Sequence, residues 1–242
     1  MRGNGLILKD HSFACLERCV LFFESFSETA DRNHRLYIGP SASWYNASLP
    51  PLDEGQNGCM YGAITGYDYL KKDRLYAGAH FSYLTGKLTG SFANNSTKEI
   101  WPEARIGYRI GLGEKGSIAP FTGYGYFAFL QKETPSDFQY RFMYIPLGFQ
   151  TTWKPVNFLE MGLNAMGGIP FASKWSAGEK YVGNTRLIAY VEVPFRFFLA
   201  ENKRYDLAFV PYWRNWSIRS KGLLIAQVNN IVGGYVQLGF NL

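Results

Sequence analysis

The sequence has no long apolar run and few charged residues. The chain has 242 residues and a mean hydropathy of −0.16. No stretch approaches the roughly 18 consecutive apolar residues that a transmembrane helix needs, so a helical membrane protein is excluded. Charged residues make up 18% of the chain, against roughly 25% in soluble domains. Aromatic residues, in contrast, reach 17%, and there are 26 glycines. This combination is typical of a β-barrel with one apolar and one polar face.

Cysteine and histidine are also scarce. The three cysteines, Cys15, Cys19 and Cys59, are odd in number and have no metal-ligand spacing, which argues against a disulfide framework and a zinc site. The sequence predicts no metal and no cofactor. The net charge of +6 raises the question of nucleic acid. Basic runs are no longer than Lys71-Lys72, however, and no basic groove with interleaved aromatics is evident, so we expect no nucleic-acid partner.

Residues 1–34 are predicted to be a leader, either a degenerate signal peptide or a disordered segment. The apolar run Cys19–Phe23 is five residues long and is flanked by charges, whereas a signal peptide usually has roughly 7–15 apolar residues. Ser27–Ala30 offers a small-residue cleavage site. We favour the signal peptide over a non-secreted leader, because the remainder of the chain resembles a secreted barrel.

From Arg35 onward the sequence alternates and is rich in aromatics, with turn residues between the segments. We predict an all-β fold over residues 35–242, a transmembrane antiparallel up-and-down β-barrel of about ten strands. The expected strands are 35–46, 57–70, 74–88, 99–112, 116–131, 138–153, 158–170, 185–199, 205–219 and 230–242.

The alternation assigns the two faces of the barrel. Every second residue from Leu187 to Phe197 is apolar, and the positions of the opposite parity, starting just before this run, include Arg186, Glu192 and Arg196. A soluble sandwich also alternates and remains an alternative. Its polar face would be mainly charged, however, whereas here that face is a mixture of Gly, Arg, Glu, Asn and Tyr. This mixture favours a crowded polar lumen.

Short and long connections alternate along the chain, as periplasmic turns and external loops do in outer-membrane barrels. An even strand number would place both termini on the periplasmic side. We expect an external partner to bind through the loops 47–56 and 171–184. The short links are 71–73, 113–115, 154–157 and 200–204, and the longer ones are 47–56, 89–98, 132–137, 171–184 and 220–229.

The last strand carries an apolar residue at every second position, namely Val236, Leu238, Phe240 and Leu242. This pattern resembles the terminal assembly signal of small Gram-negative outer-membrane β-barrel proteins, although that family usually ends in Phe. Internal phrases such as Pro120–Phe127 are similar to the same family. The resemblance implies a location in the bacterial outer membrane, contact with outer-membrane lipid and recognition by the barrel-assembly machinery.

Several charged residues fall on the predicted inward face. An unpaired charge in a narrow lumen is costly, and about ten strands only slightly exceed the eight whose interior side chains can fill. We therefore expect a filled, salt-bridged lumen and a structural or surface-interaction role, with a small passive pore as the alternative. The expected lumenal charge network comprises Asp68, Arg105, Arg109, Glu160, Glu192, Arg196 and Arg214, with Glu103 also inward and Asn164 and Gln150 as polar neighbours.

A second alternative is a lipid-modifying hydrolase. His80-Phe81-Ser82 resembles the His-x-Ser pair of outer-membrane lipid A deacylases, which implies that His80 acts as base, Ser82 as nucleophile and Glu103 as the acid that orients His80. That family carries its pair near the C-terminus and follows it with Asn, whereas here the pair is early and Tyr83 follows. The other interpretation is a lumenal histidine within a polar network.

Two further features complete the predictions. A protease of the omptin kind needs paired aspartates and an Asp-His dyad, and we find no such site among the scattered Asp53, Asp68, Asp73, Asp137 and Asp206. Aromatic residues near the predicted strand ends are interpreted as girdles at the lipid interface. These are Tyr67, Tyr69, Trp101, Trp153, Trp213 and Trp216.

Overall fold

The computed structural model describes residues 33–49, 54–71, 73–90, 95–132, 138–177, 179–181, 183–199, 203–220 and 226–242. The leader predicted over residues 1–34 lies almost wholly outside them. The strands are β1 (His34–Leu49), β2 (Glu54–Leu70), β3 (Arg74–Gly90), β4 (Asn95–Leu112), β5 (Gly116–Lys132), β6 (Phe138–Val156), β7 (Leu159–Ala177), β8 (Glu179–Tyr181), β9 (Gly183–Glu192), β10 (Phe195–Phe198), β11 (Tyr205–Ser220) and β12 (Ala226–Asn241).

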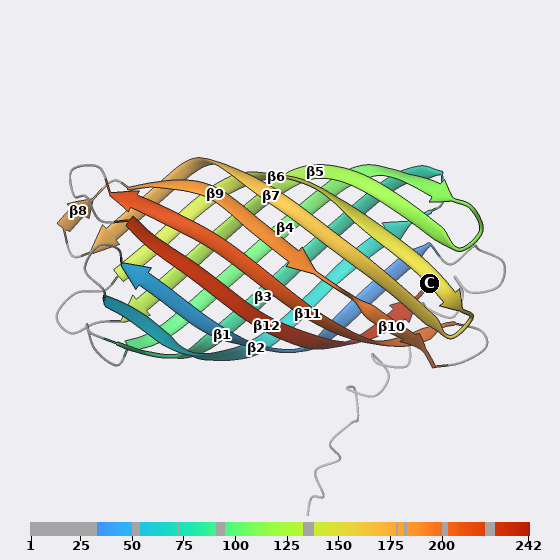
Figure 1. Cartoon of the computed structure of the whole chain (residues 1–242), viewed down its shortest axis with the longest axis horizontal. Coiled ribbons are helices and arrows are strands. Elements are labelled where there is room, and N and C mark those ends of the chain that lie inside the picture. Colours follow the sequence, from blue (N-terminus) through green and yellow to red (C-terminus); the bar gives the residue numbers. More distant parts are fainter. Residues whose placement is uncertain are drawn as a thin grey trace, which may run out of the picture.

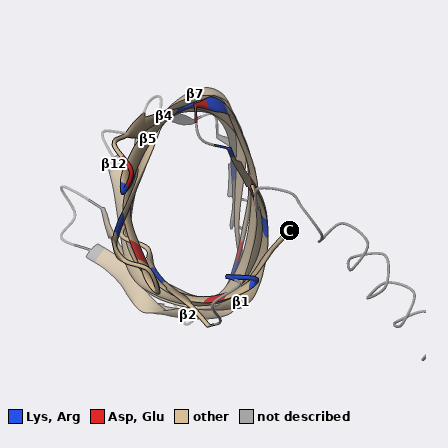
Figure 2. Ribbon diagram, turned by 90° about the vertical axis from the view of Figure 1, so that its right-hand side faces the viewer, with Lys and Arg blue, Asp and Glu red and all other residues tan. Residues whose placement is uncertain are grey.

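The strands form a closed antiparallel barrel (Figures 1 and 2). Strands β1 to β7 pair in sequence order, β11 pairs with β12, and β1 pairs with β12 to close the ring. β9 and β10 occupy one barrel position between β7 and β11, interrupted at Val193-Pro194, and β8 pairs only with β7. The barrel therefore has ten spanning positions with one extra short strand, which confirms the predicted fold class.

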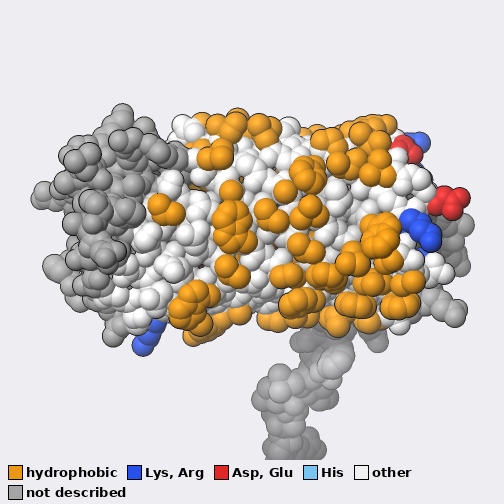
Figure 3. Space-filling view, viewed as in Figure 1, with side chains coloured by type: hydrophobic (Ala, Val, Ile, Leu, Met, Phe, Trp, Pro, Cys, Tyr) orange, Lys and Arg blue, Asp and Glu red, His pale blue; other side chains and the backbone are white. Residues whose placement is uncertain are grey.

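The two faces of the wall follow the period of two that a strand imposes. On β1, Arg35 and Tyr37 are buried while Leu36 and Ile38 are exposed. The exposed residues form an apolar belt around the barrel (Figure 3). Leu187 and Phe197, on the apolar face that the alternation predicted, are exposed in this belt. Within the described residues no helix is long and apolar enough to cross a membrane.

The start of β1 and the C-terminal residue meet at one end of the barrel. The backbone amide of Leu242 donates to the carbonyl of His34 at 2.8 Å. Tight turns lie at this end, where Asp73 and Lys203 adopt positive φ angles of 53° and 54°. We call this the inner end, because outer-membrane barrels have their short turns in the periplasm. β8 lies at the opposite, outer end (Figure 1).

The outer connections are shorter than the sequence predicted. The predicted loop 47–56 is largely strand, because β1 continues to Leu49 and β2 starts at Glu54. The predicted loop 171–184 is also wrong, since β7 runs to Ala177 and pairs with β8 in a hairpin. Strands of 16–19 residues exceed the roughly 9–11 that cross the hydrocarbon zone. Backbone pairing therefore continues past the apolar belt, where residue alternation no longer marks a strand.

A closed barrel with continuous pairing should resist detergent until it is heated. We expect the unheated protein from an outer-membrane fraction to migrate at a different apparent mass from the boiled protein on a gel. Identical migration, together with recovery in the soluble fraction, would contradict a lipid-embedded barrel.

Candidate functional site: the filled lumen

The inner half of the lumen holds a network of charges that we call the charged layer. Its centre is Arg35 on β1, which donates to both carboxylate oxygens of Asp206 on β11, from Nη2 at 2.7 Å and from Nε at 3.0 Å. Nη2 also donates to Gln237 at 3.1 Å, and Nη1 lies 4.0 Å from Asp68 on β2. Arg35 therefore links four adjacent strands across the barrel closure.

The charged layer continues around the wall through Glu160 on β7. Glu160 forms an ion pair with Arg196 on β10, and Lys154 on β6 lies 3.2 Å from its second oxygen. On the other side, Arg109 on β4 donates to the hydroxyls of Ser117 at 2.8 Å and Thr152 at 3.1 Å. The lumenal charges near the inner end thus have polar partners, as burial of a charge requires. Below this layer an open recess of about 370 Å³ is lined by turn residues.

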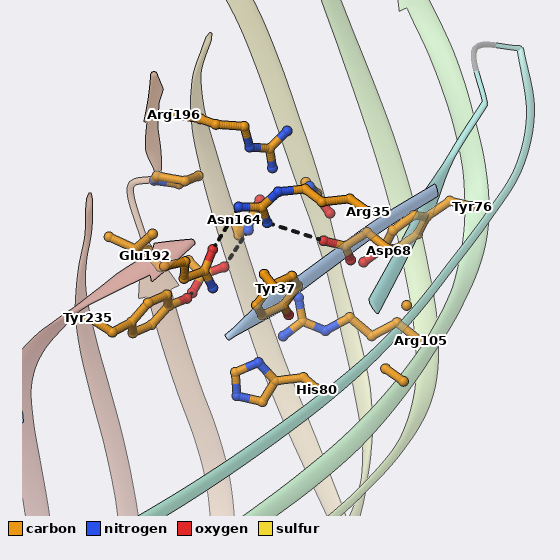
Figure 4. A pocket seen from close by; sticks show the side chains of 16 residues that line it. Arg35, Tyr37, Asp68, Tyr76, His80, Arg105, Asn164, Glu192, Arg196 and Tyr235 are labelled. Carbon is orange, nitrogen blue, oxygen red and sulfur yellow. Dashed lines mark hydrogen bonds and ion pairs between the residues drawn. The ribbon is translucent and has the colours of Figure 1, made fainter. Parts of the chain in front are cut away.

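A cavity of about 40 Å³ lies in the lumen, with the carboxylate of Glu192 on its wall (Figure 4). Glu192 on β9 accepts hydrogen bonds from Asn164, Tyr190 and Tyr235. Glu103 on β4 accepts from Arg105 and from the hydroxyl of Tyr144. Arg35, Asp68, His80 and Arg196 line the same cavity. The carboxylates already accept hydrogen bonds from neighbouring side chains. The cavity of about 40 Å³ has room for little more than water.

The outer half of the lumen is filled by aromatic rings, which we call the aromatic plug. Its centre is Trp216 on β11, which is 0% exposed. Trp216 stacks on Tyr140 with ring centroids 5.0 Å apart and an interplanar angle of 8°, and it contacts Phe142, Phe127 and Phe129. These partners belong to β5 and β6, which are not neighbours of β11, so the rings span the lumen. Tyr45 on β1 stacks on Phe129 at 5.2 Å and extends the plug.

One ion pair is embedded at the boundary of the plug. Arg214 on β11 pairs with Glu99 on β4, and both side chains are almost completely buried. The guanidinium also lies over the rings of Trp101 at 4.4 Å and Phe127 at 5.2 Å, a geometry that favours a desolvated cation. This contact joins opposite walls between the two layers.

The structure places all seven residues of the predicted charge network in the lumen. It pairs Glu160 with Arg196 and brings Asp68 towards Arg35. Sequence reasoning did not assign Arg35 and Glu99 to the network, and it named Asp206 only as a scattered acid. Each stands near the end of its strand, where a short alternating run gives a weak signal. Parity would have found them, since Leu36, Ile100 and Leu207 beside them are apolar.

The three residues of the hydrolase hypothesis also face the lumen. His80 stands directly opposite Glu103 in the β3–β4 register, and Ser82 stands opposite Trp101. No hydrogen bond joins His80 to either partner within the described structure, and His80 instead packs edge-on against Trp101 at 5.6 Å. Both oxygens of Glu103 accept from Arg105 and Tyr144. The three side chains therefore lie on neighbouring strands but do not form the hydrogen bonds of a catalytic triad.

The girdle interpretation is wrong for two of the six aromatics. Trp101 and Trp216 are 4% and 0% exposed and belong to the lumen, whereas Trp153 and Trp213 are 53% and 39% exposed on the outer wall. Trp213 and Trp216 are three residues apart, and an odd separation on a strand places side chains on opposite faces. A mixed, partly apolar lumen therefore replaces the uniformly polar one expected from the sequence.

The structure also places the predicted aspartates and the residues of the predicted C-terminal assembly signal. Asp68 and Asp206 lie near the inner end and both approach Arg35; Asp53 and Asp137 fall outside the described residues. At the C-terminus, Val236 and Leu238 are exposed on the outer wall, while Phe240 packs on Tyr205 with ring centroids 5.3 Å apart. No group of three metal-ligating side chains occurs in the described part of the chain.

No protein-family model and no curated protein matches this chain, but solved structures do. It is similar to the outer membrane protease OmpT from Escherichia coli, with a TM-score of 0.54, 10% identity, and coverage of 89% of this chain and 99% of that one. The fold is that of a bacterial outer-membrane β-barrel. The translocator domain of the autotransporter NalP from Neisseria meningitidis gives a TM-score of 0.43 at 11% identity, covering 96% of each chain. The transport unit of the autotransporter AIDA-I from Escherichia coli gives 0.45 at 8%, covering 95% and 98%.

These likenesses concern the fold. Together with the apolar belt, the barrel fold is that of a protein of the bacterial outer membrane. A fold alone does not determine a function, so the role of this chain has to be argued from its own lumen.

The first site prediction concerns the centre of the charged layer. Asp206→Ala leaves the buried Arg35 without its bidentate partner, so we expect a loss of about 3–5 kcal/mol in the free energy of unfolding. Denaturant titration of the refolded barrel would measure it, with the turn variant Glu114→Gln as a control that changes little. The double variant Arg35→Leu with Asp206→Leu should be more stable than Asp206→Ala. A single variant as stable as the wild type would contradict the role given to this pair.

The second concerns Gly125 on β5, which stands opposite Tyr144. A Cβ atom at Gly125 would lie 2.1 Å from the Tyr144 ring, so Gly125→Ala must displace the ring that holds Glu103. We expect a loss of about 1–3 kcal/mol from overpacking, measured by the same titration. Gly167→Ala is the matched control, because its Cβ would have no neighbour within 3.9 Å. Equal effects of the two substitutions would refute this account.

Proposed function

We propose that this protein is a closed, non-conducting outer-membrane barrel with a structural or surface-interaction role. The observation that supports it best is the filling of the lumen by two different layers in series. The charged layer closes the inner half through Arg35, Asp206 and Glu160, and the aromatic plug closes the outer half around Trp216. Between them lies a cavity of only about 40 Å³.

The small passive pore is less well supported. A pore needs a continuous water-filled path. The aromatic plug and the Arg214–Glu99 pair at its boundary interrupt such a path with contacts between strands that are not neighbours, and the charged layer narrows it with paired side chains. Contact with an external partner would use the outer end, where the β7–β8 hairpin, the end of β1 and the start of β2 lie.

The hydrolase alternative has one observation in its favour, the direct pairing of His80 with Glu103. Against it, Glu103 is held by other donors. In addition, Ser82 is 6% exposed at mid-height of the lumen, where the aromatic plug separates it from the outer end. A lipid chain has no room to reach the hydroxyl.

Planar-bilayer recordings test the proposal. We expect no stepwise conductance from the wild type or from variants that open one layer, such as Phe142→Ala with Trp216→Ala. Opening both layers, by adding Arg35→Ser and Asp206→Ser, should produce steady conductance. Trp213→Ala is the control, because this tryptophan lies on the same strand but faces lipid. Stable conductance steps from the wild type would overturn the closed barrel in favour of the pore.

A further inference from the structure

Among the side chains that the structure describes, the outer wall carries charge in one region. Above the inner rim, the described outward-facing strand positions hold four charged side chains, and all four are basic and exposed. They lie on four consecutive strands, β3 to β6, and every one is near the outer end of its strand. No Asp or Glu occurs among these described outward positions. We call this set the outer-wall basic patch, and it comprises Lys87, Lys98, Lys132 and Arg141.

The strand register brings three of these cations together around Ser96. Lys87 on β3 and Lys132 on β5 both stand directly opposite Ser96 on β4. Lys98 follows Ser96 by two residues and so shares its face. With strands about 4.8 Å apart and a rise of about 3.4 Å per residue, the Cα atom of Lys98 lies about 8 Å from those of the other two lysines. Three flexible ammonium groups can therefore converge on one anion.

The fourth cation is oriented by its neighbour. Nη2 of Arg141 on β6 donates to Oε1 of Gln139 at 2.8 Å. Gln139 stands in the same cross-strand row as Leu130 and Lys98, so the guanidinium is held towards the lysines. A guanidinium presents paired donors that suit a phosphate group.

The opposite wall shows that position alone does not require charge. There, Asn57, Asn46, Asn230 and Asn215 form one row in direct register across β2, β1, β12 and β11. All four face outward near the outer ends of their strands, and Asn215 donates to Asn230 at 2.7 Å. Neutral carboxamide side chains therefore occupy the equivalent height on that wall. The position near the outer end does not by itself explain the cations on β3–β6.

The position of the patch identifies its ligand class. Its next rows towards the inner end contain Tyr83, Ile100 and Ala128, and lower on the same wall Tyr124 packs on Phe171 at 6.0 Å. The patch thus borders the apolar belt at the outer membrane–water interface. Basic side chains there can extend towards anionic head groups. We propose that the outer-wall basic patch binds the phosphate groups of a phosphorylated glycolipid in the outer leaflet.

A lipid fits this wall better than an acidic protein does, because lipid surrounds the wall whereas a soluble partner approaches the loops. The inference goes beyond the closed-barrel proposal and depends only on the fold and its location, so conductance results do not bear on it.

The test measures binding of bis-phosphorylated lipid A to the refolded full-length barrel in detergent with a metal chelator. Lys87→Gln, Lys98→Gln, Lys132→Gln and Arg141→Gln are combined in one variant. Its control removes the same charges at the inner rim, through Lys71→Gln, Arg74→Gln, Lys115→Gln and Lys203→Gln. We expect the patch variant to bind more than about tenfold more weakly, since each cation near an anionic lipid surface contributes several-fold. The control should stay within about twofold of the wild type.

Two comparisons make the result decisive. Dephosphorylated lipid A should bind the wild type as weakly as the phosphorylated lipid binds the patch variant. Equal binding of both lipids to the wild type, or equal losses in the two variants, would overturn the proposal. Heat-modifiable mobility verifies the fold of each variant, and Lys87→Gln with Lys132→Gln replaces the fourfold change if that variant fails to fold.

Discussion

The structure depends on the requirement that lipid leave no backbone hydrogen bond unmade. A sheet can meet it only by closing, and here closure is the pairing of β1 with β12, from Arg35 opposite Asn241 to Ser48 opposite Val228. The charged layer crosses the same seam. Arg35 reaches Gln237 on one side and Asp68 on the other. Backbone closure and the charged layer therefore stabilise the same junction, which brings the first and last strands of the chain together.

Closure creates an interior that has to be filled, and this barrel fills it with two kinds of chemistry. Near the inner end, charges are paired and hydrogen-bonded, because an unpaired one would retain its desolvation cost. Near the outer end, rings from β5, β6 and β11 pack across the lumen and need few polar partners. The Arg214–Glu99 pair lies where the two meet, with the guanidinium against the ring of Trp101. Such an interior joins strands on opposite walls of the barrel and leaves little space for a solute.

Much of the fold could be predicted from the sequence because the wall repeats every two residues. The ten spanning positions, the lipid-facing residues and the lumenal position of Glu192 and Arg196 all follow from that period. The contacts do not, because they join distant residues, such as Arg35 and Asp206, 171 positions apart. Trp216 shows a conflict between two sequence signals. Its place near a strand end favours the lipid interface, whereas its parity relative to Trp213 assigns it to the lumen, and the parity is correct. The outer loops were overestimated because strands that leave the lipid lose their apolar alternation while keeping their backbone pairs.

The distribution of charge follows from the same geometry. Among the described lumenal side chains, six acids and six bases balance in formal charge. The acids are Asp68, Glu99, Glu103, Glu160, Glu192 and Asp206, and the bases are Arg35, Arg105, Arg109, Lys154, Arg196 and Arg214. Neutrality inside is what a low-dielectric lumen demands. No such demand acts on the outer wall, where the described charges above the inner rim have one sign. A one-signed surface at the lipid boundary repels itself unless anions lie against it, and this is the physical ground on which we propose that phosphate groups of the outer leaflet bind there.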